Sequence, residues 1–200
     1  MNTHSDVGEP APHPRSGPAA AGVLTTARLT LSPWHERYAD DLVRLSGDER
    51  VMRLISSGTW TREYARERHR QALRQWRDEG FGMRAILRDG RFAGLVSLTT
   101  CAQPDVAAPA LEIGWWIDPA EHGRGIATEA ATAVRDEAFR LGAATLVARC
   151  HPANHASERI MIKLGMTLHG DGLDRYGHPC RVYTLPRPGP RDDRVRPSTA

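Results

Sequence analysis

The amino-acid sequence predicts an α+β domain, on three observations. Apolar residues recur at helical spacing in the first third of the domain, and apolar runs on either side of "RDG" predict an antiparallel hairpin in its middle. Further along, strand-like and helix-like segments alternate in the order β-α-β-α-β. A chain of 200 residues suits one domain, over residues 23–186. Residues 1–22 and 187–200 are rich in proline, glycine and polar residues without a period, which predicts two disordered tails.

The first half of the domain is predicted to form strands around three helices. Leu29 and Leu31 alternate with polar residues, as in a strand with one buried face. Thr61 is a suitable N-cap for a long polar helix, and Asp89-Gly90 is a strong hairpin turn. The expected strands are Arg28–Trp34, Gly82–Leu87 and Arg91–Thr99, and the expected helices are Asp40–Leu45, Val51–Ile55 and Thr61–Glu79.

The second half is predicted to alternate strands with two helices. Gly142 and Gly165 each follow an apolar helical pattern and are expected to end those helices. The expected strands are Leu111–Ile117, Ala144–Cys150 and Arg181–Leu185, and the expected helices are Thr128–Leu141 and His155–Leu164.

Composition excludes several classes of protein. No apolar run approaches the roughly 18 residues of a membrane span, and the N-terminus lacks the form of a signal peptide, so we expect a cytoplasmic protein that binds no membrane. The net charge of +3 is spread along the chain, which argues against a nucleic-acid partner. The three cysteines are far apart and contain no C-x-x-C pair, so we expect reduced thiols that pack as small apolar residues.

The segment "EHGRGIATEA" places two glycines directly before a long helical pattern. The first N–H groups of a helix lack partners and its dipole is positive there, so this start suits a phosphate group. A P-loop would need Lys-Ser/Thr after Gly125, and a dinucleotide fingerprint would need a third glycine or alanine where Thr128 stands and an acid after the next strand. Both are absent, which leaves coenzyme A or a simple glycine turn.

A resemblance to a known family favours coenzyme A. The stretches "LEIGWWIDPAEHGRGIATEA" and "HPANHASERIMIKLGM" resemble the acetyl-CoA motif of the GNAT N-acetyltransferase superfamily, whose diphosphate loop reads Q/R-x-x-G-x-G/A. Gly125 and Ala127 match its last two positions, whereas His122 departs from Gln or Arg. "LTTARLTLSPW" and "NHASERIMIKLGM" look like the RimJ/RimL-type branch. The resemblance implies the acyl-CoA N-acyltransferase fold, with a mixed, mostly antiparallel central sheet flanked by helices.

The resemblance also implies a site and a reaction. Acetyl-CoA would act as co-substrate, without a metal, and its acetyl group would pass directly to an amine in a ternary complex. The implied cofactor-binding residues are Ile117, His122, Gly123, Arg124, Gly125, Ile126, Ala127, Thr128, Asn154, Ser157 and Lys163. Asn154 would contact the pantetheine arm, or else simply cap a helix. Ser157 would reprotonate the leaving thiolate, or else be an ordinary first-turn serine. The tyrosine that many relatives use stands here as Met161.

Glu112 is the acid that the sequence singles out. Its carboxylate interrupts an apolar strand, which costs free energy unless it is paired or lies beside a cleft. Burial would raise its pKa toward that of a general base for the acceptor amine, and the alternative is a structural Glu paired with an Arg. Trp60, Trp116 and the loop of residues 56–59 are the candidates for acceptor contacts. His151 and His155 have metal-like spacing, but Pro152 prevents a shared helix face.

Three functions remain open from the sequence. The first is an acetyl-CoA-dependent N-acetyltransferase, the second a non-catalytic module that binds or senses acyl-CoA, and the third an N-acyltransferase with a longer acyl donor. The acceptor would be a protein N-terminus, an amino acid, an aminoglycoside or a polyamine, and the positive charge of the domain argues against a polycation. The sequence leaves the oligomeric state open, a homodimer included.

Overall fold

The structure is a computed structural model that describes residues 22–55, 58–103, 105–174 and 177–189. The predicted N-terminal tail lies outside the described residues except for Gly22, and so does the predicted C-terminal tail beyond Gly189. Residues 56 and 57 of the loop expected to contact the acceptor also lie outside them.

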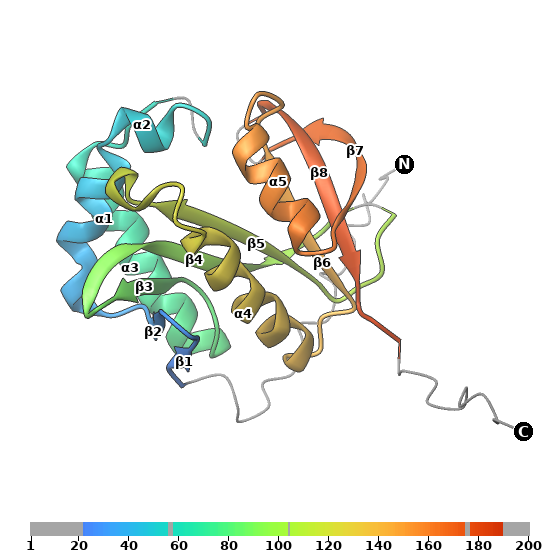
Figure 1. Ribbon diagram of the computed structural model, residues 1–200, viewed down its shortest axis with the longest axis horizontal. Coiled ribbons are helices and arrows are strands. Elements are labelled where there is room, and N and C mark those ends of the chain that lie inside the picture. Colours follow the sequence, from blue (N-terminus) through green and yellow to red (C-terminus); the bar gives the residue numbers. More distant parts are fainter. Residues whose placement is uncertain (1–21, 56–57, 104, 175–176, 190–200) are drawn as a thin grey trace, which may run out of the picture.

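One eight-stranded sheet forms the centre of the described structure, in the order β1-β2-β3-β4-β5-β6-β8-β7 (Figure 1). Neighbouring strands are antiparallel, except that β5 and β6 are parallel. This arrangement confirms the α+β class with a mixed, mostly antiparallel sheet. The strands are β1 Leu24–Thr25, β2 Thr30–Pro33, β3 Arg84–Arg88, β4 Arg91–Cys101, β5 Ala110–Ile117, β6 Thr145–Cys150, β7 Thr167–Leu173 and β8 Pro179–Pro186.

Helices cover both faces of the sheet. One buried cluster joins the side chains of the first three helices to Ala85 and Leu95, and a larger one joins the fourth and fifth helices to Ile86, Leu111 and Ile113. Because side chains alternate along a strand, these clusters lie on opposite faces. The helices are α1 Ala39–Ser46, α2 Glu49–Met52, α3 Arg62–Glu79, α4 Ile126–Arg140 and α5 His155–Lys163, with 3-10 turns η1 Glu36–Tyr38 and η2 Pro119–Glu121.

Local sequence signals end and begin these elements where they were expected. The Thr61 hydroxyl accepts a hydrogen bond from the Tyr64 N–H (3.2 Å) and caps α3. Asp89 and Gly90 both adopt positive φ in the β3–β4 turn, as an Asp-Gly hairpin requires. Gly142 follows α4 at φ +95°, a conformation that favours glycine.

Two strands and several boundaries differ from the sequence prediction. β7 was missed because its sequence, TLHGDGL, contains two glycines and no apolar alternation. β1 was missed because it is only two residues long. The helix expected at Val51–Ile55 is Glu49–Met52, since the Asp48 carboxylate caps it earlier through the Arg50 N–H. α4 begins at Ile126, two residues before the expected start.

A buried ion pair joins the sheet to α4, and no local sequence pattern predicts it. The guanidinium of Arg84 on β3 forms a bidentate pair with the carboxylate of Glu137, with Nε 2.9 Å from Oε2. The two side chains are 1% and 2% exposed. Arg84 also donates to the carbonyl oxygens of Gly22 and Leu31 and lies over the Trp76 ring. These partners hold the domain's first described residue against β3.

Candidate active site

The site begins where β5 and β6 separate. The two strands pair only from Ala110–Thr145 to Glu112–Val147. Residues 113–117 of β5 continue along β4, and residues 148–150 of β6 continue along β8, so each strand stays with its other neighbour. Figure 1 shows β6 and β8 turning away from the line of β5. The separation exposes an edge of β5 that has no neighbouring strand. The backbone N–H and C=O groups along this edge can hydrogen-bond to an extended ligand that enters the space.

The glycine loop lies at the end of β5 and opens α4. Gly123 and Gly125 adopt φ +74° and +76°, which explains why both positions are glycine. A Cβ added at Gly123 would contact nothing within 4 Å, so the space in front of it is open. Gly125 is the N-cap of α4 and forms no side-chain cap, unlike Thr61 of α3 and Asn154 of α5. The start of α4 therefore keeps its positive end free of protein acceptors.

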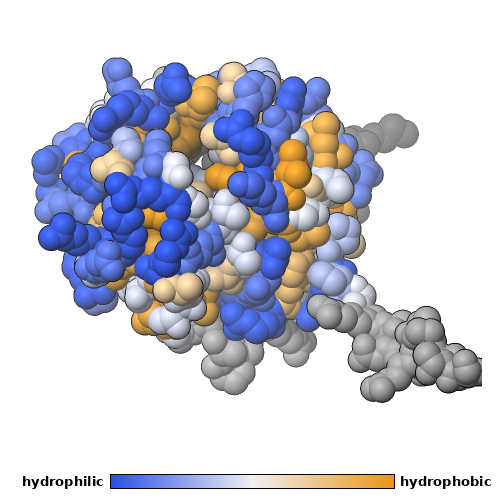
Figure 2. Space-filling view, viewed as in Figure 1, coloured by the Kyte–Doolittle hydropathy of each residue, from blue (hydrophilic) through white to orange (hydrophobic). Residues whose placement is uncertain are grey.

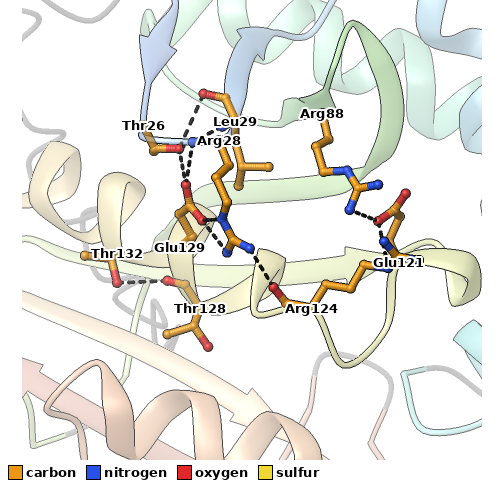
Figure 3. Close-up of polar contacts among 9 residues, drawn as sticks. All are labelled: Thr26, Arg28, Leu29, Arg88, Glu121, Arg124, Thr128, Glu129 and Thr132. Carbon is orange, nitrogen blue, oxygen red and sulfur yellow. Dashed lines mark hydrogen bonds and ion pairs between the residues drawn. The ribbon is translucent and has the colours of Figure 1, made fainter.

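A hydrogen-bonded tether holds this start in place, as Figure 3 shows. The Glu129 carboxylate accepts from the Thr26 hydroxyl (2.6 Å), the Arg28 N–H (3.0 Å) and Arg28 Nε (2.7 Å). Arg28 also donates to the Arg124 carbonyl (3.1 Å). Partial burial acts to raise the pKa of Glu129, but the hydrogen bonds from Thr26 and Arg28 lower it. This tether between β1–β2 and α4 was not predicted, because its partners are about a hundred residues apart.

The remaining loop side chains support the backbone. His122 Nε2 lies 3.0 Å from the Ile117 carbonyl and donates to it, so this departure from the family motif acts as a brace across the loop. The Arg124 side chain is exposed and lies 3.6 Å from Glu121, whose carboxylate pairs more closely with Arg88 at 2.9 Å (Figure 3). Arg124 therefore remains available at the glycine loop.

The start of α5 faces the same space from the β6 side. Asn154 is the N-cap of α5, and its Oδ1 accepts a hydrogen bond from the Ser157 N–H at 3.2 Å. This oxygen therefore caps the helix, which is the second of the two roles expected for Asn154. Both residues line the cleft between the two halves of the sheet. Met161, one turn further, also lines it and is otherwise buried.

A second network fixes this helix start. The Glu158 carboxylate accepts from the Tyr183 hydroxyl (2.6 Å) and from Arg181 (2.6 Å), both on β8, and lies 3.2 Å from His155 Nδ1. The hydrogen bond from Tyr183, followed by that from His155, lowers the pKa of Glu158 to about 2. The same bond to Glu158 raises the pKa of Tyr183 to about 12. The first turn of α5 is thereby attached to the sheet.

Glu112 lies on the opposite face of β5 from the α4 core. Its carboxylate forms an ion pair with Arg149 of β6, and Arg149 also donates to Gln103 Oε1 (2.7 Å). Burial acts to lower the pKa of Arg149, but the charge of Glu112 raises it. The sequence predicted that Glu112 is either paired or beside a cleft, and in the structure the carboxylate is both.

The cleft is a single space of about 1010 Å³ that runs past β5. Glu112 and Arg149 line one part of it, and Trp60 and Trp116 line another, with Gly114 and Ser97 between them. The space-filling view shows the surface hollowed between the α2 side and the α5 side, with apolar residues around the hollow (Figure 2). The structure therefore brings together Trp60, Glu112, Trp116, Asn154 and Ser157 as the sequence predicted.

Other predicted site residues lie differently. Lys163 is exposed at the last turn of α5 and, like the residues of the glycine loop, does not line the cleft, so its contact with the cofactor stays a prediction. The Ile126 side chain is 1% exposed in the core, so only its backbone faces the loop. Ala127 and Thr128 are half-buried in the first turn of α4.

The three cysteines lie within the described residues. Cys101, Cys150 and Cys180 are free thiols, as predicted, and burial raises the pKa of Cys150 to about 11. Within the described ranges, no group of three His, Cys, Asp or Glu side chains is arranged to hold a metal ion. Every helix of the described chain falls short of the length or apolar character needed to cross a membrane.

These features fit coenzyme A. The open edge of β5 can hydrogen-bond the amides of a pantetheine arm, and the cleft has room beside it. The uncapped start of α4, with open space at Gly123 and an exposed Arg124, suits a diphosphate. No side chain of the described residues fills the space in front of the loop glycine.

Comparisons with known proteins agree with the geometry. Residues 28–167 match the family profile described as "Acetyltransferase (GNAT) domain". The "Uncharacterized N-acetyltransferase YnaD" of Bacillus subtilis is 27% identical over 150 residues, which cover 74% of this chain and 84% of that protein. The "FsC-acetyl coenzyme A-N(2)-transacetylase" of Aspergillus fumigatus is 27% identical over 184 residues, which cover 88% of this chain and 75% of that protein.

A solved structure shows the same fold with coenzyme A. RimL, a ribosomal L7/L12 alpha-N-protein acetyltransferase crystallised in complex with coenzyme A, aligns with a TM-score of 0.70 at 20% identity. The alignment covers 82% of this chain and 98% of that structure. The family profile, over residues 28–167, spans more than half of the chain. The chain therefore belongs to the GNAT family, as an acetyl-CoA-dependent N-acetyltransferase.

Proposed function

We propose that the chain binds acetyl-CoA between β5 and β6 and acetylates a primary amine that enters from the α3 side of the cleft. The observation that carries this proposal is the separation of β5 from β6 directly beside the uncapped glycine start of α4. In this arrangement the first turn of α4 and the loop of Gly123–Gly125 hold the diphosphate, and the backbone of residues 113–117 holds the pantetheine arm.

The acceptor remains one of two kinds. The name of RimL states that it is an α-N-protein acetyltransferase, and the name of the fungal relative states that it is an acetyl coenzyme A-N(2)-transacetylase. The proposed acceptor of this chain is therefore a protein N-terminus or a small-molecule primary amine, taken up while acetyl-CoA is still bound.

The chain's own residues supply the proton transfers. An alkyl ammonium has a reference pKa near 10.4, so it must lose a proton before attack. The Glu112 carboxylate, whose Oε2 is held by Arg149, receives that proton, and Ser157 Oγ donates one on the α5 side of the cleft. Acetyl-CoA supplies the acetyl group as a thioester and leaves as a thiol. Trp60 and Trp116 contact the acceptor.

Calorimetry and kinetics on three variants test this function. Acetyl-CoA titrated into the wild-type chain is expected to bind and to release free thiol when an amine is present. Glu112→Gln and Ser157→Ala are expected to bind acetyl-CoA normally but to lose roughly 10²- to 10⁴-fold in kcat, the range for a positioned acid or base. Glu63→Gln, at an exposed position of α3, is the control and is expected to match wild type.

Two outcomes contradict parts of the proposal. If acetyl-CoA gives no heat and no protection against unfolding, the cofactor site is wrong. If it binds but no amine ever releases thiol, the chain is a non-catalytic binding module. Retention of wild-type kcat by both cleft variants would remove their catalytic roles while leaving the binding site intact.

A further inference from the structure

The acceptor side of the cleft contains an aromatic corner. The rings of Trp60 and Trp116 lie with centroids 4.9 Å apart at an interplanar angle of 72°, and Tyr64 meets Trp60 edge-on from the other side. Both tryptophans are half-buried and line the cleft. Two nearly perpendicular rings offer the face of one ring and the edge of the other, and a planar ring of the ligand can stack on the face and meet the edge.

A cation stands beside this corner. The guanidinium of Arg68 on α3 lies 5.9 Å from the centre of the Trp60 ring and lines the same cleft. Its NH1 donates to Gln71 Oε1 at 2.7 Å, but its Nε is buried and has no hydrogen-bond partner. Buried N–H groups of a guanidinium are rarely left unpaired, so this atom indicates a missing acceptor.

Nearby carboxylates are already engaged elsewhere. Glu67, the neighbour of Arg68 in sequence, pairs with Arg70 (2.7 Å) and Arg74 (2.9 Å). At the other end of the cleft Glu112 pairs with Arg149. In the described part of the chain no carboxylate lies within ion-pair distance of Arg68. A guanidinium with unused donors in a partly water-excluded cleft is a binding site for a carboxylate or phosphate oxygen.

The corner and the proton-accepting end lie in line along β5. Glu112, Gly114 and Trp116 point to the same face, and Trp116 lies about 13 Å of strand beyond Glu112. Gly114 has no side chain and is paired with Ser97, so the floor between the two ends is low. A molecule with its amine near Glu112 would place a ring against Trp60 and Trp116 and its far end at Arg68.

We propose that the acceptor of this enzyme carries, besides its amine, a planar ring and an oxyanion, and that Arg68 binds the oxyanion. This proposal rests on the proposed function, since it names the class of acceptor for the same site. Carboxylate and phosphate share the chemistry that Arg68 recognises, and the assay below separates them. Arg53 is exposed at the same cleft and adds positive charge at its mouth.

Four amines of matched shape test the proposal with the full chain and acetyl-CoA. 2-Phenylethylamine has the amine and ring, 4-(2-aminoethyl)benzoate adds a carboxylate, tyramine phosphate adds a phosphate, and 2-aminoethyl phosphate lacks the ring. We expect kcat/KM for one or both anionic ring amines to exceed that of 2-phenylethylamine by roughly 10- to 100-fold, the worth of a hydrogen bond to a charged group. 2-Aminoethyl phosphate is expected to be poor, because it leaves the aromatic corner unfilled.

Substitutions of Arg68 test whether this residue causes the preference for anionic amines. Arg68→Gln is expected to abolish the advantage of the anionic amines over 2-phenylethylamine, and Arg68→Lys is expected to keep part of it. Arg66→Gln, an exposed arginine of the same helix outside the cleft, is the matched control and is expected to keep the full advantage.

Several results would overturn the proposal. Equal use of the charged and uncharged ring amines by wild type does so, as does an Arg68→Gln variant that retains the preference. If acetyl-CoA binds but none of the four amines is acetylated, their binding is measured by tryptophan fluorescence, and binding independent of Arg68 rejects the proposal. Failure of the proposed function itself is distinguished by the absence of acetyl-CoA binding in calorimetry.

Discussion

Gly125 shows how one backbone conformation creates a binding surface. Its φ of +76° turns the chain from the end of η2 into α4, and the absence of a side-chain cap leaves the helix start open. A residue with a Cβ would adopt this conformation at a cost of roughly 1–2 kcal/mol. Gly142, at the other end of α4, has the same kind of conformation at φ +95° but lies away from the proposed diphosphate site.

The two glycines allow strain and binding to be separated. Gly125→Ala and Gly142→Ala are each expected to lower the free energy of unfolding by roughly 1–2 kcal/mol, measured by urea denaturation. Only Gly125→Ala is expected to weaken acetyl-CoA binding in calorimetry, because only Gly125 opens α4 at the proposed diphosphate site, where an added Cβ would lie 3.5 Å from the Arg28 guanidinium. Equal affinities of the two variants for acetyl-CoA would place the diphosphate elsewhere.

Single residues were predicted well where the signal is local. Thr61 as a cap and Asp89-Gly90 as a turn depend on their immediate neighbours, and both were confirmed. Glu112 was recognised as a costly carboxylate in an apolar strand, but its partner Arg149 lies 37 residues later and no local pattern names it. The unpartnered Nε of Arg68 is likewise visible only in three dimensions.

At the scale of elements, α5 depends on its attachment to β8. Glu158 in its first turn holds Arg181 and Tyr183, and Ser157 precedes Glu158 directly. The position of the proposed proton donor therefore follows from a carboxylate that takes no part in the reaction. Glu158 acts as a positioning residue.

This attachment predicts an acid-sensitive helix. The pKa of Glu158 is about 2 in the folded chain against an ordinary value of 4.5, so its contribution to stability is complete above pH 4.5 and is lost as the pH falls toward 2. Urea denaturation of wild type and Glu158→Gln at several pH values is expected to show a stability difference that shrinks over this window. Glu63→Gln serves as the control, and a difference that stays constant with pH would contradict the assignment.

The positions of most helices and strands could be predicted from the period of their apolar residues, and β7 is the informative exception. The five helices and six of the strands were expected near their observed places, because each has an apolar face with a helix or strand period. β7 has exposed and half-buried residues only, and two glycines. Since neither face of the strand is buried, its sequence lacks the alternation of apolar and polar residues that predicts a strand. Its identity as a strand comes from pairing with β8, a property of the fold and not of the segment.

For the molecule as a whole, the sheet consists of two halves that share a short parallel seam. The first half carries α1 to α3 and the second carries α5, while α4 packs across both. The buried pair of Arg84 and Glu137 fastens α4 to the first half. This pair therefore fixes the position of α4 relative to β3.

Removal of one partner of this pair is expected to be severe. Glu137→Ala leaves the Arg84 guanidinium buried without its counterion and is expected to lower the free energy of unfolding by about 3–5 kcal/mol. Arg84→Met combined with Glu137→Leu removes both charges and is expected to lose less than the single variant. Urea denaturation of the two variants checks this order, and a loss below about 1 kcal/mol for Glu137→Ala would contradict it.

The order of the strands in the sheet could not be predicted from local sequence patterns. Pairing of Arg84 with Glu137 spans 53 residues, and the insertion of β8 between β6 and β7 leaves no local trace. The family resemblance supplied the sheet and the site, because it carries the long-range arrangement that periodicity lacks.

The place of β8 has a consequence for biosynthesis. β8 pairs with both β6 and β7, yet among the described strands it is the last to be synthesised. Until it emerges, β6 has only its short seam with β5, and β7 has no neighbour in the sheet. We therefore expect the acceptor-side half of the sheet to pair first in the nascent chain, since the far wall of the cleft forms only once β8 has joined β6 and β7.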